Sequence, residues 1–117
     1  MRAFIRRFHS PDGDLPLLSP RDPTNFAILI QMLIGPAIAD GEESFDVLVC
    51  SPEWIALRAR ERGPVAGRHL LVVESFDFNS IAEFLRREVE ALDEPSWEDL
   101  ACKIGRLGRW EFEDYQP

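Results

Sequence analysis

An Asp-Gly pair at positions 40–41 separates two apolar segments, and it constrains the fold of this chain more than any other feature. The segment before it, residues 25–34, is rich in Ile, Leu and Phe, which is typical of a central strand. The segment after it alternates, so that Phe45, Val47 and Val49 share one face. Asp-Gly favours a hairpin because both central positions of a tight hairpin turn need positive φ. The sequence therefore predicts an antiparallel β-hairpin at this point.

Prolines and helix-capping residues divide the rest of the chain. Ser51-Pro52-Glu53 has the form of a helix start, and Ser96 followed three residues later by Asp99 indicates another. Around the hairpin we expect a strand at 1–8, a proline-rich loop at 9–24, a helix at 51–62, a strand at 68–75, a helix that begins after a cap at Asp77 or Asn79 and ends at Pro95, a helix at 96–108 and a terminal strand at 109–115. This order predicts one α+β domain over residues 1–117, with two layers: a mostly antiparallel sheet and about three helices packed on one face.

The charge balance of the chain limits the partners that it can bind. Its 117 residues contain 21 Asp and Glu against 13 Lys and Arg, which gives a formal net charge of −8. Nucleic-acid binding needs a cationic surface that displaces counterions from phosphate, and a cytoplasmic membrane surface is itself negative. We therefore expect neither nucleic acid nor membrane as a partner, and the charge favours a basic protein.

The cysteines and the apolar segments bear on cofactors and location. Cys50 and Cys102 form no CxxC pair, and we expect two reduced core thiols rather than a zinc site or a disulfide. The longest apolar stretch, residues 26–38, is interrupted by Gln31 and Gly35-Pro36, which makes it unsuitable for crossing a bilayer. The N-terminus lacks the apolar run of a signal peptide. These features predict a cytoplasmic protein with no cofactor and no metal.

Two histidines, His9 and His69, offer little for catalysis. Ser10 follows His9 directly, but adjacent strand residues point to opposite faces of a sheet. No nucleophile-elbow pattern, P-loop or GxGxxG is present. We therefore expect no catalytic residues and no enzyme. One alternative stays open: His9, Asp12 and Asp14 lie within six residues, and they would serve a small metal-dependent hydrolase.

Acidic side chains lie next to aromatic ones near both ends of the hairpin and at the C-terminus. Residues 88–117 contain nine acids against three bases, and the pattern of an acid beside Phe, Trp or Tyr recurs in ESF, PEW and WEFEDY. Carboxylates around an aromatic anchor suit a protein–protein interface. For each tryptophan taken alone, a place in the core is the simpler interpretation. Taken together, the pattern indicates a binding protein.

Several segments resemble one protein family. FHSPDGDL, DPTNF, IGP, GEESFDVLVCSPEW and the terminal GRWEFEDY are similar to the immunity protein 8 family of bacterial polymorphic toxin systems, such as contact-dependent inhibition. The resemblance extends from the first expected strand to Tyr115. It implies an intracellular antidote that binds the C-terminal toxin domain of its cognate toxin stoichiometrically. The resemblance implies no catalytic residue.

These observations together give a hypothesis for the contact surface. Nuclease toxins present basic grooves because they bind phosphate, and an acidic inhibitor associates with such a groove through electrostatic steering. We expect Trp54 or Tyr115 to be a partly exposed anchor. The acidic contacts are expected from Glu42, Glu43, Asp46, Glu111, Glu113 and Asp114. A second alternative is an acidic regulatory subunit that docks on a cytosolic complex, and the oligomeric state is open.

Overall fold

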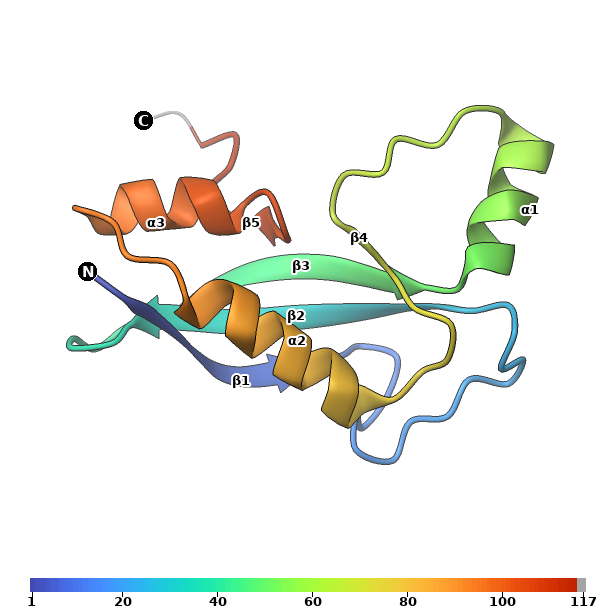
Figure 1. Ribbon diagram of the computed structural model, residues 1–117, viewed down its shortest axis with the longest axis horizontal. Coiled ribbons are helices and arrows are strands. Elements are labelled where there is room, and N and C mark those ends of the chain that lie inside the picture. The colour runs from blue at the N-terminus through green and yellow to red at the C-terminus, as the bar shows by residue number, and fades with distance from the viewer. Residues whose placement is uncertain (116–117) are drawn as a thin grey trace.

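The computed structural model describes residues 1–115 and contains one five-stranded sheet (Figure 1). Four strands follow the order β1-β2-β3-β4, and the fifth, β5, also pairs with β3. Only the β3–β4 pair is parallel; the other three pairs are antiparallel. The strands are β1 (Ala3–His9), β2 (Ala27–Pro36), β3 (Glu43–Cys50), β4 (Leu70–Val72) and β5 (Arg109–Trp110). The expectation of a mostly antiparallel sheet is therefore confirmed.

The β2–β3 hairpin is present, and its connection is longer than a two-residue turn. The register runs from Ala27 opposite Cys50 to Ile34 opposite Glu43, so residues 37–42 form the loop. The Arg6 guanidinium holds this loop by donating hydrogen bonds to the carbonyls of Pro36, Ala39 and Gly41. The prediction of a hairpin is correct, whereas the tight turn is replaced by a loop tied to β1.

Three helices accompany the sheet: α1 (Pro52–Arg62), α2 (Phe78–Glu90) and α3 (Trp97–Ile104). Each begins at a side-chain cap that the sequence pattern indicates, Ser51, Asp77 and Ser96 respectively. Helices α2 and α3 bury an apolar face, but no residue of α1 is buried. Helix α1 accordingly lies at one end of the sheet in Figure 1, while α2 crosses in front of the sheet. These observations confirm the α+β class with three helices.

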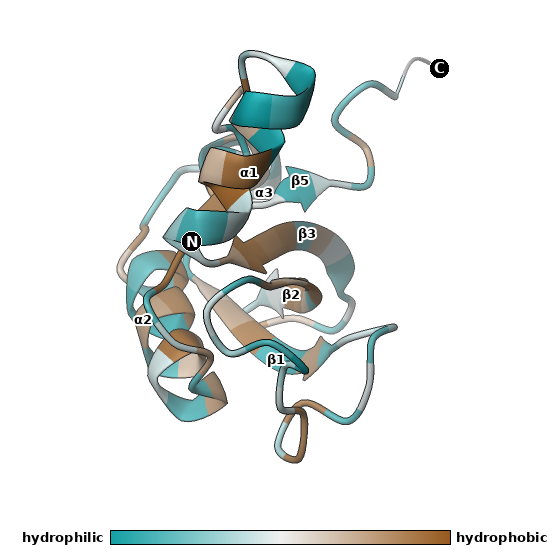
Figure 2. Ribbon diagram, turned by 90° about the vertical axis from the view of Figure 1, so that its right-hand side faces the viewer, coloured by the Kyte–Doolittle hydropathy of each residue, from teal (hydrophilic) through white to brown (hydrophobic). Residues whose placement is uncertain are grey.

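The core lies between one face of the sheet and helices α2 and α3. Alternate residues of β2 and β3 point into it, and Ile30, Met32 and Phe45 are fully buried there. Leu85 of α2 and Leu100 of α3 cover them from the helical side. In Figure 2, α2 lies to the left of the sheet, and no described helix covers the right-hand side. One face of the sheet is thus left without a second layer.

Several boundaries differ from the sequence-based expectations. The terminal strand is limited to Arg109–Trp110, and residues 111–114 form turns instead of continuing to 115. Strand β4 covers three residues rather than 68–75, and at its start the left-handed φ of 64° at His69 interrupts the extended backbone. Helix α3 ends at Ile104, and turns occupy the rest of 96–108.

Both cysteines are free, but only Cys50 is buried, so the expectation of two core thiols is wrong for Cys102. No helix among residues 1–115 has the length and apolar character to span a bilayer.

Candidate functional site

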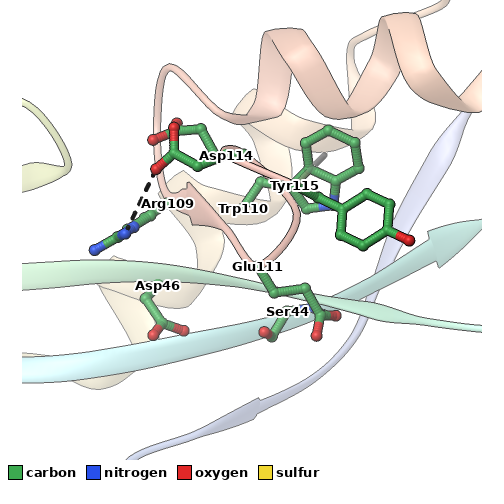
Figure 3. A pocket seen from close by; sticks show the side chains of 8 residues that line it. Ser44, Asp46, Arg109, Trp110, Glu111, Asp114 and Tyr115 are labelled. Atoms are coloured by element: carbon green, nitrogen blue, oxygen red, sulfur yellow. Dashed lines mark hydrogen bonds and ion pairs between the residues drawn. The ribbon is translucent and has the colours of Figure 1, made fainter. Parts of the chain in front are cut away.

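The edge of β3 that faces away from β2 carries a pocket formed by two distant parts of the chain. Strand β4 pairs with the C-terminal half of β3, which leaves the N-terminal half of the same edge to β5. The pocket lies where β5 and the segment after it meet β3, and its volume is about 450 Å³ (Figure 3). It is lined by Ser44, Asp46, Arg109, Trp110, Glu111, Glu113, Asp114 and Tyr115.

Backbone pairing determines which of the expected contact residues meet here. Phe45 lies opposite Trp110 and Asp46 lies opposite Arg109 in the β3–β5 ladder. The Ser44 N–H then donates to the Glu111 carboxylate at 2.8 Å, beyond the end of the ladder. Five of the eight residues expected at the contact surface therefore line one pocket: Asp46, Glu111, Glu113, Asp114 and Tyr115.

A chain of aromatic rings fixes the C-terminal segment to the core. Trp110 stacks on the buried Phe45 with ring centroids 6.2 Å apart and an interplanar angle of 9°. Phe112 meets Trp110 edge-on at 5.9 Å, and Tyr115 meets Phe112 in the same way, also at 5.9 Å. Tyr115 at the end of this chain is 68% exposed. The segment is thus anchored at its inner end and presents an aromatic ring to solvent at its outer end.

The carboxylates of the pocket differ in how far they are already neutralised. Glu113 accepts a hydrogen bond of 2.6 Å from Arg68, and Asp114 lies 3.8 Å from the Arg109 guanidinium. Asp46 has a buried oxygen, Oδ1, with no hydrogen-bond partner among residues 1–115. Most buried polar atoms are hydrogen-bonded in proteins, so this enclosed oxygen is an exception within a residue that lines the pocket.

Three of the expected contact residues do not line this pocket. Glu42 forms an ion pair of 2.8 Å with Arg7, and the Glu43 carboxylate accepts a hydrogen bond from the Trp97 indole. Trp54 lies on α1, where Arg58 covers its ring at 4.7 Å. The structure thus divides the expected surface into the pocket, the hairpin end and α1.

The alternative metal site receives no geometric support. No group of three His, Cys, Asp or Glu side chains among residues 1–115 is arranged to hold a metal ion. Asp12 instead accepts a hydrogen bond of 2.9 Å from the Leu29 N–H, where β2 extends beyond its pairing with β1. The observed contact of Asp12 is therefore with the backbone of the sheet.

Comparison with protein families identifies the chain. A model of the family described as immunity protein 8 matches residues 3–115. The chain belongs to the immunity protein 8 family. It is therefore an immunity protein of a toxin system, and its family implies that it binds a cognate toxin and has a non-catalytic role. No curated protein and no solved structure shows significant similarity to it.

The sequence did not predict the roles of two residues that support the pocket of this immunity protein, Arg68 and His69. Arg68 contacts Glu113, and the half-buried His69 lies near the same carboxylate at 3.7 Å while its Nε2 contacts the Gly105 carbonyl at 2.7 Å. Residues 68 and 113 are 45 positions apart, and nothing in their local sequence indicates that they meet. The only signal was the position of His69 at the start of an expected strand.

Proposed function

We propose that this immunity protein neutralises a nuclease toxin domain in the cytoplasm by placing its acidic pocket against the basic substrate groove of the toxin. Binding is stoichiometric and is accelerated by electrostatic steering. A nuclease must attract phosphate, so its groove carries the positive charge that complements this protein. The chain acts as a binding protein in this proposal and performs no chemistry.

The observation that carries the proposal is the charge of the pocket lining. Four carboxylates and one guanidinium surround the pocket, and the whole chain has a net charge of −8. Opposite potentials on two partners raise the association rate far above that of neutral proteins, and salt reduces the effect. The acidic surface therefore supports fast capture of a basic partner.

The partner's basic side chains have two kinds of site in the pocket. The carboxylate of Asp46 lines the pocket, and a carboxylate suits the Nζ of lysine or the forked N–H groups of arginine. Tyr115, which also lines the pocket, is 68% exposed and provides a ring that can pack against the aliphatic part of such a side chain. An aromatic anchor next to carboxylates is a frequent arrangement at interface hot spots.

The proposal is tested with the toxin domain encoded beside this chain's gene, purified from the complex under denaturing conditions and refolded. The association rate is measured by stopped flow for wild type and for Asp46→Asn/Asp114→Asn at low and high salt. We expect the double variant to associate at least about tenfold more slowly at low salt, with the difference shrinking at high salt.

A matched control removes the same charge elsewhere. Glu53 and Glu61 are exposed on α1, away from the pocket, so Glu53→Gln/Glu61→Gln changes the net charge equally. This control is expected to reduce the rate only slightly. Equal effects of both double variants would show that the overall charge, and not the pocket, governs association.

A further inference from the structure

The uncovered face of the sheet carries apolar side chains beside polar ones. Outward positions alternate with the core positions, and in the central strand β2 they include Leu29, Gln31 and Leu33. A sheet face that only meets water typically carries polar side chains in this alternation. Here Phe4 of β1 is 47% exposed, and the outward leucines are half-buried. The apolar residues of this open face include Phe4, Leu29, Leu33, Leu48 and Leu70. Polar residues share the face: Arg7 and Ser44 lie opposite Leu33, and His9 and Asp46 lie opposite Gln31.

The open face is continuous with the acidic pocket. Ser44 and Asp46 line the pocket from β3, and their cross-strand neighbours on β2 are Leu33 and Gln31. Directly opposite residues on one face of an antiparallel pair have Cβ atoms only about 5 Å apart. A protein that covers the pocket therefore meets Leu33 immediately beside it.

The size of the pocket shows that the interface must extend beyond it. A stable protein–protein interface buries about 800 Å² on each partner and involves about 20 to 30 residues a side. The pocket has eight lining residues, so it is too small to be the whole contact of a stoichiometric inhibitor. Interfaces of that kind combine an apolar centre with a polar rim. The open face supplies the apolar centre, and the pocket supplies a charged part of the rim.

We propose that the open face of the sheet is the apolar half of the toxin-binding surface, and that it packs against an apolar area of the toxin domain next to the toxin's basic groove. This inference rests on the proposed function for the identity of the partner. It assigns a role to residues of β1 and β2 that have no place in the acidic pocket.

The test replaces exposed apolar area without changing charge. Threonine is β-branched and therefore suits strands, so Phe4→Thr/Leu33→Thr removes apolar area with little disturbance of the sheet. The control is Leu17→Thr/Ile38→Thr, because these side chains are 81% and 91% exposed in loops. The dissociation constant for the refolded toxin domain is measured by calorimetry, and urea unfolding of each free variant checks its fold.

We expect the open-face variant to bind about tenfold to a hundredfold more weakly, and the loop variant to bind like wild type. The loss is expected to be similar at low and high salt, because apolar contacts are not screened. If Phe4→Thr/Leu33→Thr has a lower urea midpoint, Phe4→Thr alone, at the more exposed position, is compared instead.

The open-face variant and the pocket variant together separate this inference from the proposed function. Unchanged affinity of the open-face variant, together with slower association of Asp46→Asn/Asp114→Asn, overturns the open-face inference and leaves the acidic pocket in place. The opposite pair of results keeps the open face and overturns the pocket. A dimer of the free chain that Phe4→Thr/Leu33→Thr dissociates would show that the open face binds a second copy, and the inference would be wrong.

Discussion

The Ser44 backbone and the Glu111 carboxylate are joined by a hydrogen bond of 2.8 Å, and the Glu111 N–H donates back to the Ser44 carbonyl at 3.1 Å. These two bonds connect residues that are 67 positions apart. They hold the acidic C-terminal segment against β3, where Asp46 projects. The acidic pocket depends on this connection more than on any local sequence pattern.

Loss of the Glu111 side chain is expected to loosen this segment. Glu111→Ala removes the acceptor for the Ser44 N–H, and we expect a cost of about 1 kcal/mol in the free energy of unfolding. Glu111→Gln keeps an oxygen that can accept the same bond, so its cost is expected to be smaller. Urea denaturation of the two variants measures the difference, and equal losses would contradict the role assigned to this bond.

The stacking of Trp110 on Phe45 is expected to be the main anchor of the C-terminus. We expect Trp110→Ala to lower the free energy of unfolding by about 2–3 kcal/mol, below the usual cost for a fully buried tryptophan because Trp110 is partly exposed. Trp54→Ala is the control, since α1 contains no buried residue, and its expected cost is about 1 kcal/mol or less. A larger loss from Trp54→Ala than from Trp110→Ala would refute this assignment.

Gly35 permits the close approach that ties the hairpin loop to β1. A Cβ at this position would lie 2.0 Å from the Gly41 carbonyl oxygen and 2.7 Å from Arg6 Nε. We expect Gly35→Ala to cost at least about 2 kcal/mol, because backbone must move to relieve the contact. A Cβ on Gly67 meets nothing within 4 Å, so Gly67→Ala is expected to be neutral or slightly stabilising. Thermal unfolding of the two variants compares them, and similar melting temperatures would contradict the contact.

The two thiols are expected to react very differently. Burial raises the pKa of the Cys50 thiol, whereas Cys102 is exposed. A thiol reagent near pH 8 should therefore modify one cysteine per folded molecule and two after unfolding. Because burial raises the pKa of Cys50 only in the folded state, folding favours the neutral thiol. This preference stabilises the fold below the ordinary thiol pKa, and the stabilisation is lost as the pH rises from that value through the raised pKa. Rapid modification of both thiols in the folded protein would contradict the burial of Cys50.

The sequence predicts those features of the fold that depend on neighbouring residues. The β2–β3 hairpin and the caps at Ser51, Asp77 and Ser96 follow from local alternation and from side-chain oxygens at helix starts, and all are observed. The class of fold follows from their order. These signals act within a few residues, which is why they can be read without the structure.

Long-range contacts set the features that the sequence did not predict. Residues 111–115 have strand-like composition, but the backbone turns there, with hydrogen bonds from the Glu113 N–H to the Trp110 carbonyl and from the Tyr115 N–H to the Phe112 carbonyl. The positive φ of His69 interrupts the extended backbone at the start of β4, and the contact of Arg68 with Glu113 closes one side of the pocket. For the candidate site, the structure brings Asp46 together with the acidic and aromatic C-terminus, whereas Glu42, Glu43 and Trp54 of the expected contact surface lie outside the pocket. Whether this pocket binds toxin stays a prediction.

Hydrogen exchange of the free chain and of its complex with the refolded toxin domain tests the central claim most directly. Residues 111–114 form turns at the surface of the free protein, so amides in 111–115 are expected to exchange faster than those of the β2–β3 hairpin. The account predicts that toxin binding slows exchange in 111–115 and leaves α1 unchanged. Protection of α1 with no change at 111–115 would contradict it, because the toxin would then bind away from the acidic pocket.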